Sequence, residues 1–175
     1  MAKKTKSDIS NSALRIFLQD VGKFYDEAKG FEEFVPKKGQ KEELLKYFDF
    51  QCCFCGCQIN IKSLSQDHLV PMNKKSLGLH SWGNIVPCCQ DCNNKKKQKH
   101  WKDFLKDKCS SNLILRKRKK KISDFVKIKQ YDPNVDLHEL ADNLYEDIGE
   151  VAMTLIKLRY NQAEDRIKKL LNKSG

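Results

Sequence analysis

The sequence predicts an α+β protein in which a small cysteine-bounded core is flanked by helices. Two cysteine pairs with C-x-x-C spacing, Cys52 with Cys55 and Cys89 with Cys92, enclose a short polar and apolar stretch. Apolar residues recur at helical spacing before and after it. With 39% hydrophobic and 33% charged residues, the chain of 175 residues has the composition of a folded globular protein. We expect an N-terminal helical segment (1–49), a core (50–108), a basic arm or linker (109–135) and a C-terminal helical segment (136–175).

Two helices are predicted in the N-terminal segment. Ser10 and Asn11 are suitable N-caps, and an apolar stripe follows them until Gly30. A second, shorter helix is expected over 41–48, where it leads into the first cysteines.

The central segment is expected to contain two short strands followed by a helix. One strand carries Cys52 to Cys55 and the other covers 65–70, and a loop follows over 72–83. A basic helix over 94–106 would turn its apolar residues, Trp101, Phe104 and Leu105, towards the core.

Positive charge is concentrated in one part of the chain. The formal net charge is +11, and fifteen Lys and Arg stand against three Asp between Asn93 and Lys129. Such a block favours a polyanionic partner. Within it, six consecutive positive residues from Arg116 to Lys121 predict an exposed loop, a hairpin arm or one face of a strand pair.

The C-terminal segment predicts a long amphipathic helix. Asp136 and Glu139 form a start like a capping box, an apolar stripe continues to Leu170, and Gly149 is placed to bend or split the helix. Packing back on its own domain is the favoured interpretation. The alternative is association with a second copy or a partner protein through this helix.

The cysteines indicate a metal site rather than disulfides. We expect a cytoplasmic protein with no membrane contact, because no apolar run is long enough to span a bilayer and no signal peptide precedes the first helix. Cys52, Cys55, Cys89 and Cys92 provide the four-sulfur set that structural Zn²⁺ prefers. Other registers would use Cys53, Cys57 or Cys88, but Gly56 directly follows Cys55, where a tight turn needs it.

Polar residues between the cysteine pairs are candidates for chemistry. Asp67 and His68 are neighbours on a predicted strand, so their side chains point to opposite faces and contact different groups. The carboxylate suits a hard divalent cation, and the imidazole suits an incoming water.

Four motifs occur in a fixed order over about 50 residues: Cys52-x-x-Cys55-Gly56, Asp67-His68-Leu69-Val70-Pro71, Trp82-Gly83-Asn84-Ile85-Val86-Pro87, and Cys89-x-x-Cys92-Asn93 followed by three lysines. In this order and spacing the chain resembles the zinc-bound form of the HNH endonucleases, also called ββα-metal nucleases. The residues give an H-N-N variant.

The resemblance implies a metal-dependent endonuclease that hydrolyses phosphodiester bonds of double-stranded DNA to 5′-phosphate and 3′-hydroxyl ends. His68 would be the general base and Asn84 would brace the loop that orients it. Asp67 and Asn93 would hold catalytic Mg²⁺ or Mn²⁺, beside the structural Zn²⁺. Asn94 is a weaker candidate for the role of Asn93, and His80 and His100 are reserve ligands or phosphate contacts.

Lysines and arginines after the second cysteine pair would contact the nucleic acid: Lys95, Lys96, Lys97, Lys99, Arg116, Lys117, Arg118 and Lys119. By analogy, the enzyme would serve restriction, phage defence or a mobile element. Two alternatives stay open: a zinc-stabilised nucleic-acid-binding module without catalysis, and a nuclease subunit that docks in a larger defence complex through its C-terminal helix.

Overall fold

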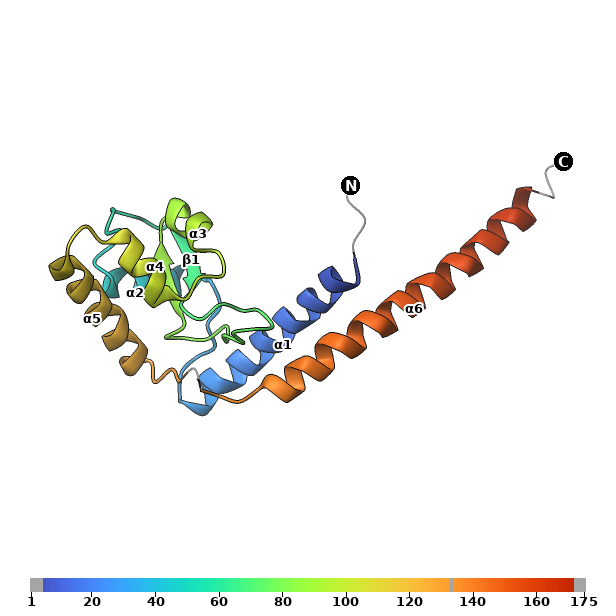
Figure 1. Ribbon diagram of the computed structural model, residues 1–175, viewed down its shortest axis with the longest axis horizontal. Coiled ribbons are helices and arrows are strands. Elements are labelled where there is room, and N and C mark those ends of the chain that lie inside the picture. The colour runs from blue at the N-terminus through green and yellow to red at the C-terminus, as the bar shows by residue number, and fades with distance from the viewer. Residues whose placement is uncertain (1–4, 133, 172–175) are drawn as a thin grey trace.

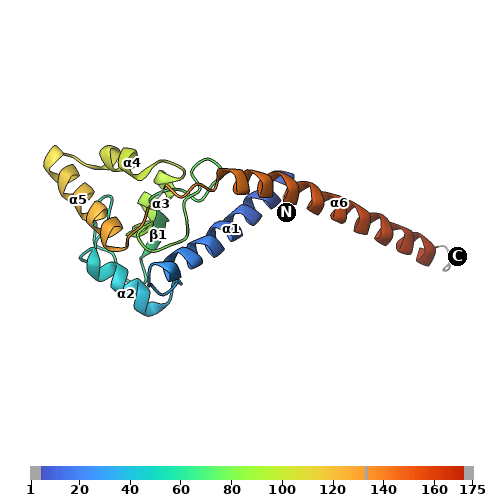
Figure 2. The same ribbon diagram turned by 90° about the horizontal axis from the view of Figure 1, so that it is seen from below.

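A computed structural model describes residues 5–132 and 134–171, which fold as an α+β structure (Figure 1). In chain order the elements are α1 (Lys6–Ala28), α2 (Lys38–Tyr47), β1 (Ser65–His68), β2 (Ile85–Cys88), α3 (Gln90–Lys96), α4 (Trp101–Lys108), α5 (Asn112–Ile128) and α6 (His138–Leu171). The small sheet lies among α2 to α5, while α1 and α6 form an elongated helical pair on one side (Figures 1 and 2).

Helix α1 begins earlier than the N-caps at Ser10 and Asn11 predict. Thr5 caps it in a capping box with Asp8, which satisfies backbone donors that a helix start leaves free. Leu14 and Leu18 on its inner face are almost completely buried. Gly22 lies directly against the backbone carbonyl of His80, where any side chain would collide, so the helix packs closely on the loop before β2.

The sheet consists of β1 and β2 paired antiparallel, with Asp67 opposite Val86 and His68 opposite Ile85. The strand expected over Cys52 to Cys55 is absent. That segment is a turn closed by an isolated bridge between Gln51 and Gln58. Below the sheet, α2 and α5 enclose the main apolar core with Phe48, Ile85 and Phe125.

Two helices replace the single helix expected over 94–106. Helix α3 begins earlier, at Gln90, and ends where Lys97 adopts a left-handed backbone with φ +49°. Helix α4 then starts with His100 as its N-cap, whose ring Nδ1 accepts a hydrogen bond from the backbone N–H of Lys102 at 3.3 Å. The break allows α3 to stay on the sheet while Trp101, Phe104 and Leu105 enter the core.

The basic run from Arg116 to Lys121 is helical, so the expected loop, hairpin or strand pair is wrong. Ser111 caps α5, and the helix buries Ile122 and Phe125. Helical periodicity explains the difference: the apolar residues after the run extend one face of a helix that begins before it.

Helix α6 continues through Gly149 without a break. Gly149 is buried against α1, where an added Cβ would lie 2.5 Å from Ser10 Oγ. Ser10 Oγ also donates to the Tyr145 carbonyl at 2.7 Å, and Lys6 pairs with Glu150 at 2.7 Å. The glycine therefore serves close helix packing, and the segments 1–49 and 136–175 share one helical pair.

Candidate metal centre and polar cavity

Four thiols gather where the turn before β1 meets the start of α3. The sulfur atoms of Cys52, Cys55, Cys57 and Cys89 all lie within 4.8 Å of one another. Cys55 Sγ and Cys89 Sγ are 3.7 Å apart, close to the ~3.8 Å that a tetrahedral zinc with Zn–S bonds of about 2.3 Å requires. This group could therefore hold a structural metal ion such as zinc.

The turn that carries the first thiols is fixed by its own backbone. The Cys52 N–H donates to the Cys57 carbonyl, and the Gly56 N–H donates to the Cys52 carbonyl, both at 2.8 Å. Gly56 has φ +76°, a conformation that favours glycine. Cys89 joins from the other side because it is the N-cap of α3.

The thiol set differs from the predicted one in its fourth member. Cys92 is buried beside the cluster and its thiol hydrogen-bonds with those of Cys89 and Cys55, but it is not in the mutually close set, which contains the exposed Cys57 instead. Burial alone would raise the pKa of Cys55. Hydrogen bonds from Cys57, Cys52 and Cys92 oppose burial and lower that pKa to about 7, which favours the thiolate that binds metals.

Arg118, a residue of α5, supports the turn that carries Cys52, Cys55 and Cys57, which is called the metal turn below. Its Nη1 donates to the Phe54 carbonyl at 2.8 Å and its Nη2 to the Cys55 carbonyl at 2.7 Å. A side chain at Gly56 would collide with this guanidinium. Two of its donors are thus engaged by the backbone, while the predicted contact of Arg118 with nucleic acid stays a prediction.

Asp67, His68 and Asn93 line one polar cavity of about 500 Å³. Its other lining residues come from α1, from the loop between the strands and from the end of α3: Arg15, Gln19, Pro71, Met72, His80, Lys97 and Gln98. The strand, the loop and two helices distant in sequence therefore meet at this cavity.

Lys96 is enclosed beneath the cavity. Its side chain is fully buried, its Nζ lies 3.0 Å from Asp67 Oδ2, and it donates to the His68 carbonyl at 2.6 Å. Burial raises the pKa of Asp67, and the charge of Lys96 acts in the opposite direction. Its ammonium faces the protein interior, while the predicted contact of Lys96 with nucleic acid stays a prediction.

His68 is held against a second imidazole. His68 Nε2 and His80 Nδ1 are 3.1 Å apart, and the rings are tilted by 49°. Burial, followed by the charges of His80, Lys96 and Arg15, lowers the pKa of His68 to about 3. The ring is thus neutral at physiological pH, the form that can accept a proton.

Asn84 is buried and ties the loop to the strands. Its Oδ1 accepts from the Val70 N–H at 2.8 Å, and its Nδ2 donates to the carbonyls of Leu79 and Val70 at 2.7 and 3.1 Å. These bonds close the loop that carries His80. Asn93 donates through Nδ2 to Ser65 Oγ at 2.7 Å, so its amide is anchored on β1 with Oδ1 directed elsewhere.

The donor set is suited to a hard cation. Asp67 Oδ2 is buried, and apart from its ion pair with Lys96 it has no hydrogen-bond partner among the described residues. A buried carboxylate oxygen and an amide oxygen are ligands that Mg²⁺ accepts. Asn94 does not line the cavity and its Oδ1 accepts from Gln90, and His100 caps α4.

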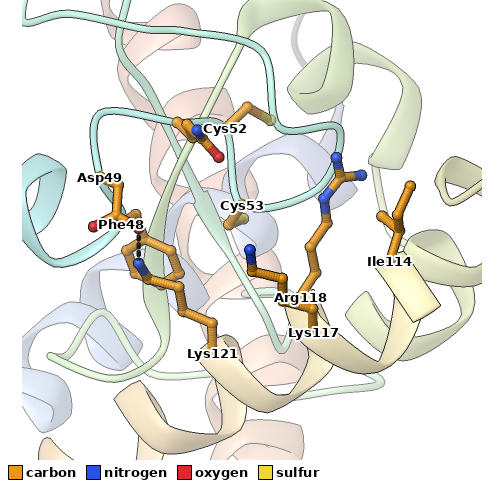
Figure 3. Close-up of a pocket in the computed structure, with 9 residues that line it drawn as sticks. Phe48, Asp49, Cys52, Cys53, Ile114, Lys117, Arg118 and Lys121 are labelled. Carbon is orange, nitrogen blue, oxygen red and sulfur yellow. Dashed lines mark hydrogen bonds and ion pairs between the residues drawn. The ribbon is translucent and has the colours of Figure 1, made fainter.

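The remaining predicted lysines and arginines divide into two groups. Lys97 lines the polar cavity, and Lys95 and Lys99 are exposed in ion pairs with Asp91 and Asp107. Arg116, Lys117 and Lys119 are exposed on α5. Figure 3 shows Lys117, Arg118 and Lys121 of α5 around a second cavity, of about 270 Å³, beside Cys52 and Cys53.

Sequence reasoning overlooked Arg15, Gln19 and Gln98, and treated His80 only as a reserve ligand. Arg15 and Gln19 lie on a helix whose sequence reports only an apolar stripe, so no local signal assigns them to the cavity. His80 had a detectable signal, as one of four histidines and the only one between His68 and Asn84.

No protein-family model and no curated protein sequence matches the chain. Within residues 5–132 and 134–171, no helix has the length and apolar content that crossing a membrane requires. The functional conclusion therefore rests on the site itself.

Proposed function

We propose that the protein is a metal-dependent DNA endonuclease with a structural zinc, related in its core to the HNH nucleases. The observation that carries the proposal is the meeting of Asp67, His68 and Asn93 with Arg15 and Lys97 in one open polar cavity. A carboxylate, a neutral imidazole, an amide and two cations are the groups that phosphodiester hydrolysis uses.

His68 acts as the general base. When its Nε2–H donates to His80 Nδ1, the other ring nitrogen keeps its lone pair and can take a proton from the attacking water. Burial, Lys96 and Arg15 oppose the positive charge that then forms on His68, while the hydrogen bond to His80 strengthens with it. His80 therefore orients the base and holds its tautomer.

Asp67 and Asn93 hold the catalytic Mg²⁺ or Mn²⁺. When bound, this ion supplies charge stabilisation at the phosphate oxygens and the leaving 3′-oxygen. Lys96 keeps Asp67 ionised in its buried position. Arg15 and Lys97 attract the phosphate backbone to the cavity, and the expected substrate is double-stranded DNA. Restriction, phage defence and mobile-element activity are the roles that we consider for such an enzyme.

Cleavage of supercoiled plasmid in Mg²⁺ or Mn²⁺ tests this function. The wild type should nick or linearise the plasmid, and His68→Ala should lower the rate at least about a hundredfold. The variant should keep its bound zinc and its circular dichroism spectrum. The matched control is His138→Ala, an exposed histidine at the start of α6, which should cut like the wild type.

A second function has one specific observation in its favour. Helix α5, which carries the run from Arg116 to Lys121, and helix α1, which contributes Arg15 and Gln19 to the cavity, lie on opposite sides of the small sheet (Figures 1 and 2), so α5 offers a binding surface separate from the proposed cleavage site. A zinc-stabilised nucleic-acid-binding module would use that surface alone. DNA binding by the wild type with no cleavage in either metal would favour this module over the nuclease.

A further inference from the structure

The second half of α6 exposes several large apolar side chains. Beyond the point where α1 starts, the helix projects alone from the molecule (Figures 1 and 2). Leu155, Ile156 and Tyr160 are 52%, 54% and 65% exposed. The other exposed large apolar residues of this half are Val151, Met153, Leu158 and Ile167.

Such a helix is expected to be covered. Exposed apolar side chains on a lone helix are normally covered by a partner, and an isolated helix in water has little stability of its own. Met153, Ile156 and Tyr160 form a largely apolar surface together with Thr154 and Lys157.

The charges of α6 indicate what covers it. Five acidic residues and no basic one lie between 139 and 150, whereas five basic and two acidic residues lie between 157 and 169. A second α6 running in the opposite direction would set the basic half of each helix along the acidic half of the other. A second α6 running in parallel would set like charges together, which destabilises a helix pair.

The acidic half also offers apolar surface to a partner. Leu140 is 60% exposed beside α1, although Ala141 and Gly149 on the neighbouring face are buried against that helix. A helix packed along this half would therefore bury apolar residues from both chains. Apolar contact and charge complementarity then favour the same arrangement.

We propose that the protein forms a homodimer in which the second half of α6 packs antiparallel on α6 and α1 of a second copy. The two chains together form a bundle of helices, and each carries its own polar cavity and thiol cluster on the outside. The dimer rests on the α6 surface alone. If the protein is the proposed nuclease, its partner is a second copy of the chain, and the dimer has two cleavage sites.

Light scattering coupled to gel filtration tests the dimer. The wild type should have twice the 20.4 kDa mass of one chain. The double variant Leu155→Glu/Ile156→Glu should have the mass of one chain while keeping its zinc. The control is Ile128→Glu, which places one glutamate at a similarly exposed apolar residue at the end of α5, and it should remain dimeric. A monomeric wild type, or a double variant that remains dimeric, would overturn the proposal.

Cross-linking tests the direction of the helices. A photoreactive amino acid at Ile167, in dimers mixed from isotopically light and heavy chains, should cross-link to residues 139–150 of the other chain. Cross-links to the region around residue 167 of the other chain would show a parallel pair and overturn the antiparallel arrangement. Plasmid cleavage is measured separately, so a monomer that cuts refutes only the dimer, and a dimer that does not cut refutes only the nuclease.

Discussion

The thiol cluster and the polar cavity both adjoin the short helix α3, but they differ in their ligand atoms and in how open they are. At its start, Cys89 joins sulfurs from a turn closed by its own backbone and by Arg118. At its end, Asn93 and Lys97 line an open space of about 500 Å³ with titratable neighbours. Four sulfurs leave a metal no free position, whereas a few oxygen ligands in an open cavity do.

In the proposed nuclease the cluster would serve stability and the cavity reactivity, and α3 connects the two. This helix has only seven residues, so loss of the thiol site would also displace Asn93 and Lys96. Variants at the two ends should therefore differ in kind: those at the cluster should unfold the core, and those in the cavity should leave a folded protein.

Removal of a thiol should have the largest effect. Cys89→Ala should lose bound zinc and the cooperative unfolding transition, because structural zinc binding is coupled to folding. Zinc content by atomic absorption and thermal unfolding followed by circular dichroism measure this. The same assays on Cys57→Ser and Cys92→Ser identify the fourth ligand, since only replacement of a ligand releases zinc. A Cys89→Ala protein that keeps its full zinc content and an unchanged unfolding transition would contradict the proposed metal centre.

Lys96→Met should have the next largest effect. It leaves Asp67 buried without its cation, which typically costs about 3–5 kcal/mol in the free energy of unfolding. The control is Lys95→Met, because Lys95 is the preceding residue and its ion pair with Asp91 is exposed. Urea unfolding of both variants measures the difference. Equal stabilities would contradict a buried ion pair beneath the cavity.

Arg118→Ala should destabilise the protein by about 2 kcal/mol, through loss of two charged hydrogen bonds to the metal turn. Arg116→Ala is the matched control, because Arg116 is exposed on the same helix. Both variants remove one charge, so DNA affinity measured at several salt concentrations separates the two roles. A stability loss only in Arg116→Ala would place the support of the turn elsewhere.

The smallest effect concerns pH. The pKa of His68 falls from 6.5 to about 3 on folding, so the unfolded chain takes up a proton that the folded chain does not. Stability from this group is present above pH 6.5 and is lost as the pH falls, by about 1.4 kcal/mol per pH unit. Between pH 7 and pH 5, the free energy of unfolding measured with urea should therefore fall more steeply for the wild type than for His68→Asn. Parallel pH profiles would show that the imidazole is not buried in a neutral form.

Much of the local structure could be predicted from the sequence. The helical segments at both ends and the strand through Asp67 and His68 follow from apolar periodicity, which depends only on neighbouring residues. The predicted site residues Asp67, His68 and Asn93 line one cavity because they lie on two adjoining elements, β1 and α3. The break at Lys97 and the helical state of the run from Arg116 to Lys121 were missed, since a run of lysines carries no periodicity.

The sequence by itself determined that this chain has an α+β core, a cysteine group able to hold a metal and a strongly basic segment, because residue type and spacing encode these properties. Only the tertiary structure decided which identical residues differ in role: Lys95 is exposed and Lys96 is buried under Asp67, and Arg116 is exposed while Arg118 holds the metal turn. The reason is physical, since burial and partners arise from contacts between segments distant in sequence, and local pattern contains no record of them.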